Sequence, residues 1–426
     1  MKTKIVAVLL SGCLAAGLAG TVTVQAKEKK VTKEEGEQIT LELMDGTSET
    51  QYQEWEEEII SRFEEENPNI KIEITKVSAD SWNQTVMTRF ASGDAPDLFT
   101  FTENDVADMV PSGYVMDLSE SANIENYDEG MLDSLSVDGK VYALPISNDL
   151  MCVTYSKDVF EKAGITEVPK TWDDFMKVCE TLKGQDITPL VAGFADQWAV
   201  NGVGQTTYCA AVLGQDGPAL ADVASRKVTF AGTEQWKNTL TKISEMYPYM
   251  NEDLFGTDMN TCYDMVANGE AAMIPNISAA VNNVMSMNPD AEYGIFALPV
   301  ADSEENNKMP MCPPAKGFSI SESTAHKEEA MKFLEYLTSP ESITVFAEKG
   351  AGIPIVKGVD TSSLTGAFKD GADMIQSGDF KLITGKSFQS SFEDAFIRDL
   401  SDFFLEGCKD VDAALEQMDT DFDNLQ

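Results

Sequence analysis

The sequence predicts an α/β protein built as two lobes. Short runs with alternating apolar residues, such as Ile39–Leu43 and Ile70–Ile74, are typical of strands, and the stretches between them, with apolar residues three or four apart, are typical of helices. Because the two kinds alternate, we expect parallel strands joined by helical crossovers. About 390 residues follow a charged N-terminal stretch, which is more than one core usually holds and favours two lobes.

The first 26 residues have the pattern of a secretory signal peptide. A basic start, Met1–Lys4, precedes the apolar stretch Ile5–Gly20, and Val24–Ala26 supplies the small-x-small pattern after which signal peptidase cuts. The apolar stretch is shorter than the about 20 residues that a transmembrane helix needs. We therefore expect an exported protein that is extracellular or associated with the cell envelope.

The same segment contains a second processing signal. Leu10–Cys13 (LSGC) has the form of a bacterial lipobox, whose cysteine carries a lipid. The residues after Cys13 stay apolar where a polar tether is expected, so we favour cleavage after Ala26 and keep a lipid anchor at Cys13 as the alternative. Residues 27–37 are charged and lack apolar periodicity, which predicts a flexible tether.

The chain is strongly acidic, with a formal net charge of −41. Loss of residues 1–26 removes Lys2 and Lys4 but no acid, which leaves 29 basic and 72 acidic residues and a net charge of −43. Such a surface repels nucleic acid and anionic membranes, because both bind proteins through Lys and Arg. We expect no nucleic-acid partner, and membrane association only through a permease or the Cys13 anchor.

Apolar spacing and helix breakers predict the elements of the N-terminal part. Tyr52, Trp55, Ile59 and Phe63 recur at three- and four-residue steps, which predicts a helix with one buried face that ends at Asn67–Pro68. Further along we expect a helix over Trp82–Phe90 that Gly93 stops, a strand over Leu98–Phe101 and an extended run over Val141–Pro145.

The alternation of strands and helices continues in the C-terminal part. Thr171 is a good N-cap, and Asp173 and Asp174 follow in the first turn, where the helix dipole favours acids. We further expect strands over Met151–Tyr155, Ala271–Ile274, Tyr293–Leu298 and Phe318–Ile320, and helices from Lys157 to Gly164, over Glu328–Leu337 and over Phe392–Leu405.

Signatures of catalysis are missing from the sequence. The one histidine, His326, lies at a predicted helix start, and no metalloprotease, nucleophile-elbow or phosphate-loop motif occurs. The six cysteines of the mature chain are widely spaced, which fits neither a zinc site nor a redox motif, and Cys152 and Cys179 lie in apolar patterns typical of buried thiols. We expect no enzyme activity, no cofactor and no metal, although paired carboxylates are able to hydrolyse glycosides.

Several short sequence blocks, spread over almost the whole mature chain, occur in an order that is informative about its family. The most specific are Tyr155–Phe160 (YSKDVF) and Pro169–Phe175 (PKTWDDF), and Phe63–Ile70 and Ala91–Leu98 precede them. Together the blocks resemble extracellular solute-binding proteins of ABC importers, in the sugar-binding cluster that contains maltose-binding protein. Further matching blocks are Ile39–Leu41, Gly269–Met273, Tyr293–Pro299 and Ala330–Ser339.

This resemblance implies a two-lobed periplasmic-binding-protein-like fold, in which each lobe is a central β-sheet flanked by helices and hinge crossovers join the lobes. Lobe one would take residues 38–147 and 298–350, and lobe two residues 148–297 and 351–426. The implied function is capture of a mono- or oligosaccharide by a monomer and its delivery to the permease subunits of an ABC transporter. Ligands of open α/β sheets bind at the carboxyl ends of strands, so closure of facing lobes would enclose the sugar and shift the population toward a form that the permease recognises.

A sugar site needs carboxylates or amides for the hydroxyls and aromatic rings for the apolar C–H faces. The resemblance places an acidic ligand contact of the lobe crossover at Asp149, with Asn148 beside it, and a role for Asp149 in capping a turn is the alternative. In lobe one we expect contacts after the first and third strands, from Asp45, Ser48, Phe101 and Asn104. Turn formation is the alternative for Asp45 and Ser48, and a core position for Phe101.

Lobe two supplies the remaining candidates. Gln197-Trp198 lies in a predicted polar loop, so Trp198 is our preferred stacking residue. Asn276 and Ser278 follow a predicted strand at a place where relatives often carry Gly and Trp, and this departure weakens an assignment to long oligosaccharides. Phe318 follows Lys316-Gly317 and is expected to line either the cleft or the core.

Three other functions stay open at this point. A binding protein for another solute would take a polyamine, a peptide or a phosphate ester. An excess of acids in the cleft would indicate a cationic ligand, and an arginine there an anionic one. A secreted glycoside hydrolase would carry two carboxylates roughly 5–10 Å apart. A sensor would bind solute in the same way and report to a membrane partner.

Overall fold

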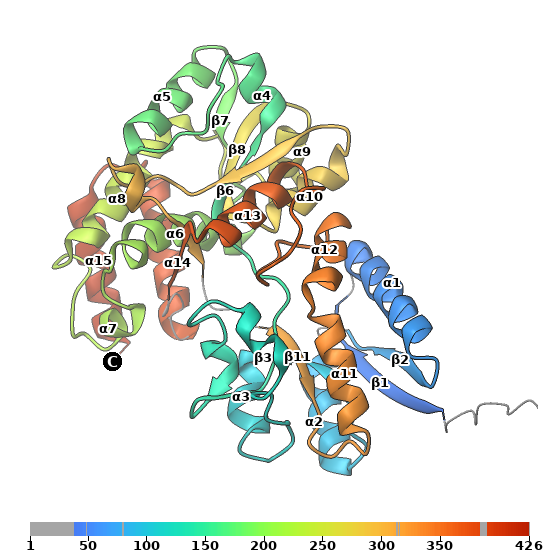
Figure 1. Cartoon of the computed structure of the whole chain (residues 1–426). Helices are drawn as coiled ribbons and strands as arrows, with labels where there is room; N and C mark the ends of the chain where they lie inside the picture. The colour runs from blue at the N-terminus through green and yellow to red at the C-terminus, as the bar shows by residue number, and fades with distance from the viewer. Residues whose placement is uncertain are drawn as a thin grey trace, which may run out of the picture. The chain divides into compact units, whose positions relative to one another are not determined.

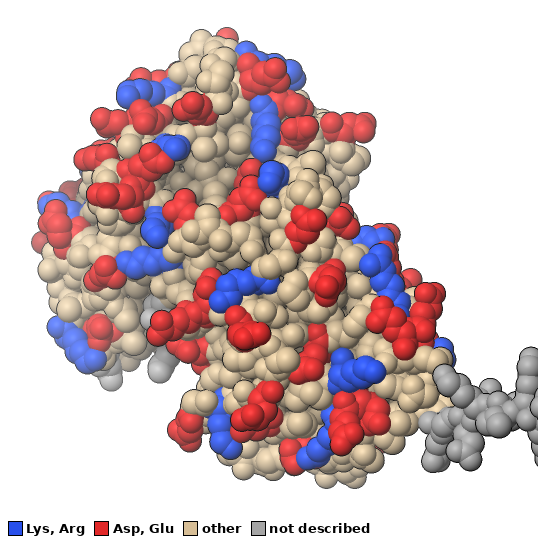
Figure 2. All heavy atoms as spheres, in the orientation of Figure 1, with Lys and Arg blue, Asp and Glu red and all other residues tan. Residues whose placement is uncertain are grey.

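The computed structural model describes residues 38–47, 49–78, 81–311, 314, 316–383 and 390–425, without the side chains of four of them (103, 104, 107 and 390). The predicted signal peptide, lipobox and tether lie outside the described residues. Gln38–Gln426 form one compact unit that contains two four-stranded sheets (Figure 1). Acidic side chains are spread over the face shown in Figure 2, with Lys and Arg among them. In the described part of the chain, no helix has the length and apolarity needed to span a membrane.

The first sheet has the strand order β11-β3-β1-β2. The central strand β1 pairs in parallel with β2 and β3, and β11 pairs antiparallel with β3 at the edge. Its strands are β1 (Ile39–Asp45), β2 (Ile70–Lys76), β3 (Leu98–Thr102) and β11 (Lys316–Ile320), and the nearby helices in Figure 1 are α1 (Thr50–Glu66), α2 (Trp82–Ser92), α3 (Glu103–Met109), α11 (Lys327–Leu337) and α12 (Pro340–Glu348).

The predicted face of α1 and the predicted ends of α1 and α2 are confirmed, whereas α3 and α12 were not predicted from the sequence. The apolar face of α1 is buried at Tyr52, Trp55, Ile59 and Phe63, and the ring of Trp55 packs edge-on against Phe346 of α12 with centroids 5.2 Å apart. Asn67 caps the C-terminus of α1, as predicted. Gly93 ends α2 in the left-handed conformation, with φ at 78°, which glycine adopts without steric cost.

The second sheet has the strand order β7-β8-β6-β9. Strand β6 pairs antiparallel with both of its neighbours, whereas β7 and β8 are parallel. Its strands are β6 (Met151–Ser156), β7 (Thr188–Leu190), β8 (Ala271–Ile277) and β9 (Tyr293–Phe296). The expectation of parallel pairing is therefore confirmed for β1, β2, β3, β7 and β8 and is wrong for β6, β9 and β11. A chain that crosses between sheets is free to enter the next sheet in either direction.

Helices surround the second sheet. Thr171 caps α5 as predicted, because its Oγ1 accepts from the backbone N–H of Asp174 at 3.3 Å. The helices are α4 (Lys157–Lys162), α5 (Trp172–Lys183), α6 (Gln197–Ala211), α7 (Leu220–Ala224), α8 (Glu234–Met246), α9 (Met259–Ala267), α10 (Ala280–Met287), α14 (Ser390–Leu405) and α15 (Val411–Asn424). Cys152 and Cys179 are buried free thiols, as predicted, and Cys312 lies outside the described residues.

Three connections run between the two sheets and contact one another. Leu144 exchanges backbone hydrogen bonds with Phe318 at 2.9 and 3.0 Å, and Ser147 and Leu150 form isolated bridges to Pro354 and Met311. The crossover segments are thus joined to one another and to β11 by backbone hydrogen bonds, in the position expected for a hinge. The small elements of the remaining chain are β4 (Ser136–Val137), β5 (Lys140–Val141), β10 (Met309–Met311), α13 (Gly366–Ser377) and β12 (Phe380–Leu382), of which β4 pairs with β5 and β10 with β12.

Candidate functional site

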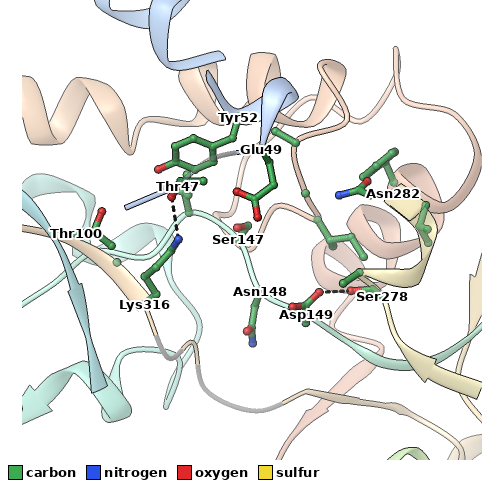
Figure 3. A pocket seen from close by; sticks show the side chains of 18 of the residues that line it. Thr47, Glu49, Tyr52, Thr100, Ser147, Asn148, Asp149, Ser278, Asn282 and Lys316 are labelled. Carbon is green, nitrogen blue, oxygen red and sulfur yellow. Dashed lines mark hydrogen bonds between the residues drawn. The ribbon is translucent and has the colours of Figure 1, made fainter. Parts of the chain in front are cut away.

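A pocket of about 340 Å³ lies where the three crossovers meet both sheets (Figure 3). It is at the carboxyl ends of β1, β3 and β8 and at the amino ends of the antiparallel strands β6 and β11. We call it the hinge pocket, and it is lined by Thr47, Glu49, Tyr52, Thr100, Ile146, Ser147, Asn148, Asp149, Ser278, Ala279, Val281, Asn282, Lys316, Gly317, Phe318, Ala351, Gly352, Ile353, Ala367 and Phe368.

The two sides of the hinge pocket carry different polar groups. On the side of the first sheet, the Lys316 ammonium donates to Thr47 Oγ1 at 3.0 Å and lies 5.8 Å from the centroid of the Tyr52 ring. On the other side, Asp149 Oδ1 accepts from Ser278 Oγ at 2.9 Å, as Figure 3 shows. The pocket therefore offers one ammonium, carboxylates, amides and hydroxyls beside aromatic rings, which suits a neutral polyhydroxylated ligand.

Ser278 also fixes the crossover in place. Its Oγ accepts from the backbone N–H of Leu150 at 3.0 Å, and its own N–H donates to the carbonyl of Leu150 at 2.9 Å. The end of β8 and the crossover that carries Asp149 are thus held as one piece.

A buried charge network supports the opposite wall. Asp45 is fully buried and accepts from Thr47 Oγ1 at 3.1 Å and from Thr100 Oγ1 at 2.6 Å. Its carboxylate also pairs with Lys76 at 2.7 Å, and Lys76 pairs with Glu56 at 2.5 Å. Asp45 itself does not line the hinge pocket, so it acts by orienting two hydroxyls that do.

The ionised form of Glu56 is the least favourable charge in this buried network. Burial, and next the nearby Asp45 carboxylate, raise the pKa of Glu56 to about 7, although the hydrogen bond from Lys76 favours the ionised form. Two carboxylates share one ammonium here, and no described residue hydrogen-bonds to Glu56 Oε1. Partial burial favours the neutral form of Lys76, but its hydrogen bonds to Asp45 and Glu56 together outweigh burial and raise its pKa.

We expect Glu56→Gln to weaken the dependence of stability on pH between about 4.5 and 7. Folded Glu56 keeps its proton up to about pH 7, whereas the unfolded chain releases it near 4.5, so the free energy of unfolding falls as the pH rises through this window. The variant should gain stability over the wild type on the order of 2 kcal/mol between pH 5 and pH 8. Urea unfolding across this range measures the gain.

Asp399, whose pKa burial also raises to about 7, provides the control for this experiment. It lies on α14, away from the hinge pocket, so Asp399→Asn alone should reduce the slope in the same pH window, and the double variant should reduce it further. A parallel offset between wild type and Glu56→Gln at every pH would contradict the shifted pKa of Glu56.

Four of the residues predicted from the sequence meet in the hinge pocket: Asn148, Asp149, Ser278 and Phe318. Phe101 is instead fully buried in the core beside Phe99, with ring centroids 6.2 Å apart, so the proposed contact set leaves it out. Asp45 does not line the pocket and instead supports it through hydrogen bonds from Thr47 and Thr100. Ser48 and the side chain of Asn104 lie outside the described residues.

Trp198 and Asn276 line a different pocket, of about 360 Å³. The predicted polar loop at Trp198 is wrong, because Gln197 begins α6 and Trp198 lies in its first turn. Two glycines in the helix, Gly202 and Gly204, disfavour helix formation locally, but there is no room for larger side chains: a Cβ on Gly204 would lie 2.7 Å from Leu400. Packing therefore outweighs propensity in this segment.

Sequence reasoning missed several residues of the hinge pocket, notably Glu49, Asn282, Lys316 and Phe368. Glu49 lies in the loop after β1, at the N-cap of α1, so the rule that ligands bind at the carboxyl ends of strands was a usable signal for it, whereas Lys316 lies at the amino end of β11 and carries no such signal. Asn282 and Phe368 lie in the first turns of α10 and α13 and carry no comparable signal. Among the described residues, no cluster of His, Cys, Asp or Glu is arranged to hold a metal ion.

Comparisons with known proteins agree with this architecture. A family model described as "Bacterial extracellular solute-binding protein" matches residues 46–343, which is more than half of the 426 residues. The multiple sugar-binding protein of Streptococcus mutans is 26% identical over 360 residues, which cover 80% of this chain and 81% of that protein. The maltodextrin-binding protein MdxE of Bacillus subtilis is 24% identical over 361 residues, covering 82% and 79%.

Solved structures show the same fold. The apo form of RafE from Streptococcus pneumoniae has a TM-score of 0.73 at 22% identity, covering 92% of this chain and 98% of that one. RafE in complex with raffinose has a TM-score of 0.67 at 22% identity, covering 91% and 99%. The two-lobed α/β fold and the family expected from the sequence are thus confirmed. The chain belongs to the family of bacterial extracellular solute-binding proteins.

Proposed function

We propose that this protein captures a carbohydrate outside the cell and delivers it unchanged to the permease of an ABC transporter. The observation that carries the proposal is the position of the hinge pocket, which residues of both sheets and all three crossovers line. A ligand bound there contacts both sheets at once, so binding favours the arrangement in which they close around it. The names of the multiple sugar-binding and maltodextrin-binding relatives support a carbohydrate as the ligand.

The same proposal includes lobe boundaries and export. Lobe one takes residues 38–147 and 298–350, and lobe two residues 148–297 and 351–426. The positions of β9 in the second sheet and β11 in the first support a crossing between them. The protein is exported through its N-terminal 26 residues, acts as a monomer and catalyses no reaction.

The charges of the hinge pocket favour a neutral sugar over the alternatives. A single ammonium, from Lys316, faces the carboxylates Glu49 and Asp149, so neither a strong excess of acids nor an arginine marks the pocket. A polyamine or a phosphate ester would need a larger charge of one sign. Hydroxyl and amide groups make up most of the remaining polar lining, which matches the hydroxyls of a sugar.

A thermal-shift screen against mono-, di- and trisaccharides tests the proposal. A sugar at 100 times its Kd should stabilise the folded protein by about 2.7 kcal/mol and raise the Tm accordingly. The bound sugar, recovered and analysed by mass spectrometry, should be chemically unchanged. Absence of a shift with every sugar, together with a shift by a polyamine, peptide or phosphate ester, would replace the carbohydrate with that ligand.

A further inference from the structure

A chain of hydrogen bonds joins a buried carboxyl group to the wall of the hinge pocket. Glu56 Oε2 accepts from Lys76 Nζ at 2.5 Å, and Asp45 Oδ2 accepts from the same ammonium at 2.7 Å. Asp45 Oδ1 accepts from Thr47 Oγ1 at 3.1 Å. Thr47 Oγ1 in turn accepts from Lys316 Nζ at 3.0 Å, as Figure 3 shows. Thr47 and Lys316 line the pocket and Glu56 does not, so Glu56 is linked to the pocket through Lys76 and Asp45.

The buried end of this chain holds more negative than positive charge. Glu56 is 1% exposed and Asp45 is fully buried, and the two carboxylates share the Lys76 ammonium. Glu56 Oε1 is buried without a donor from any residue that the structure describes. A protonated Glu56 leaves one carboxylate and one ammonium here, which is the less costly arrangement for a buried network.

The charges that act on the Glu56 carboxyl come from three elements. Asp45 of β1 and Glu57 of α1 disfavour its ionised form, whereas Lys76 of β2 favours it. The helices α11 and α12 also pack on α1, and three charged residues in or next to them bond to other groups. These residues are Lys332, Glu335 and Lys349, which bond to Asn67, Ser121 and Glu58. The charge of Glu56 is therefore balanced by Lys76, which Asp45 shares.

The pocket end of the chain is open to solvent. The Lys316 side chain is exposed, and its Nζ and that of Lys76 lie 5.8 and 5.7 Å from the centroid of the Tyr52 ring, which also lines the pocket. Solvent beside this wall screens the repulsion between the carboxylates of Asp45 and Glu56. A sugar that fills the pocket replaces this solvent, so the repulsion grows and binding favours the protonated form of Glu56.

We propose that the proton on Glu56 regulates the hinge pocket: the protein binds its sugar more tightly when Glu56 is protonated and releases it more readily when Glu56 is ionised. This inference rests on the proposed function and adds control of that function by pH. Because coupling between two binding sites is reciprocal, a sugar that favours the protonated form takes up protons as it binds.

The direction of the pH effect follows from this coupling. Burial raises the pKa of Glu56 to about 7, and bound sugar should raise the pKa further. Well below pH 7 the side chain is protonated with or without sugar, so the affinity does not change with pH. Above this pH the sugar-free protein loses the proton first, so the Kd rises with pH until the sugar-bound form is ionised too.

Calorimetric titration of glucose, maltose, maltotriose and raffinose between about pH 5.5 and about pH 9 tests the proposal. For the sugar that binds the wild type most tightly, the Kd should stay constant up to about pH 6 and rise about fivefold by about pH 9. Glu56→Gln mimics the protonated side chain, so its Kd should stay near the wild-type value at about pH 6 over the whole range. Because this variant is expected to be at least as stable as the wild type, unfolding does not limit the measurement.

Asp399→Asn is the matched control. It removes another buried carboxyl group whose pKa burial raises to about 7, on α14 and outside the lining of the hinge pocket, so this variant should keep the wild-type dependence of the Kd on pH. A second measurement counts protons, by titration at about pH 7.5 in phosphate and in Tris, whose ionisation enthalpies differ. Wild type and Asp399→Asn should take up protons on binding, and Glu56→Gln should not.

The outcomes separate the regulation from the function. A wild-type Kd that is the same at about pH 6 and about pH 9 overturns the regulation while the carbohydrate function stands. The same holds if Glu56→Gln keeps the wild-type pH profile and proton uptake, or if Asp399→Asn abolishes both. A Glu56→Gln variant with an altered Kd but unchanged proton uptake would give Glu56 a structural role alone. Failure of all four sugars to bind at any pH overturns the proposed function itself and the regulation with it.

Discussion

Asp149→Ala is expected to weaken carbohydrate binding by roughly thirtyfold, which corresponds to about 2 kcal/mol. The Asp149 carboxylate lines the hinge pocket in the crossover between the two sheets, and a charged acceptor for a sugar hydroxyl is worth more than a neutral one. In the proposed closure around the sugar, the lost contact is one that favours the closed form. Calorimetric titration of a sugar found in the thermal-shift screen measures the loss.

Two further variants separate ligand contact from support of the crossover. Asp149→Asn keeps the shape and one acceptor, so it should lose less affinity than alanine. Ser278→Ala removes the hydrogen bond to Asp149 and the acceptor for the Leu150 N–H, and it should lower the free energy of unfolding by about 1 kcal/mol. If Asp149→Ala left the sugar affinity unchanged and lowered only the free energy of unfolding, the role of Asp149 would be support alone.

Gly317→Ala should lower the free energy of unfolding by about 2–3 kcal/mol and weaken sugar binding as well. A Cβ at Gly317 would lie 2.8 Å from the carbonyl carbon of Leu144 and 2.9 Å from its oxygen, which are backbone atoms and cannot rotate away. The paired backbone hydrogen bonds between Leu144 and Phe318 hold these two strands at that distance. Separation of the strands would shift Lys316 and Phe318, which line the hinge pocket. Urea unfolding and sugar titration measure the two effects.

Gly113→Ala is the matched control for the Gly317 variant. Gly113 has a left-handed φ of 69°, and a Cβ there meets no atom within 4 Å, so alanine brings backbone strain without a clash. The cost should be about 1 kcal/mol with no change in sugar affinity. Equal destabilisation by the two substitutions would contradict the close packing of the crossovers at Gly317.

Element positions followed from the sequence because local signals set them. The face of α1, the Thr171 cap of α5 and the Gly93 end of α2 depend on residues only a few positions apart, and each is confirmed. Predicted bounds differ from the observed ones at element ends, as at β9, which ends at Phe296 where a strand to Leu298 was expected. Strand direction was harder to predict, since β6 and β11 acquire theirs from crossings between the sheets.

The candidate site could be predicted only in part, from strand ends or from the family resemblance. Asp149 was found from the resemblance and Ser278 from its place after a strand, and the two side chains lie within hydrogen-bonding distance, at 2.9 Å. The buried network of Asp45, Lys76 and Glu56 could not be predicted, because its members come from β1, β2 and α1 and meet only in the packed fold. Trp198 was predicted as a stacking residue but in a loop, since the glycines of α6 concealed the helix.

Small-angle X-ray scattering with and without a saturating sugar tests the central claim most directly. If the two sheets close around a guest at the crossovers, the radius of gyration should fall on binding and return when the sugar is dialysed away intact. A bound sugar that leaves the radius of gyration unchanged, or that comes out of the protein chemically altered, would contradict it.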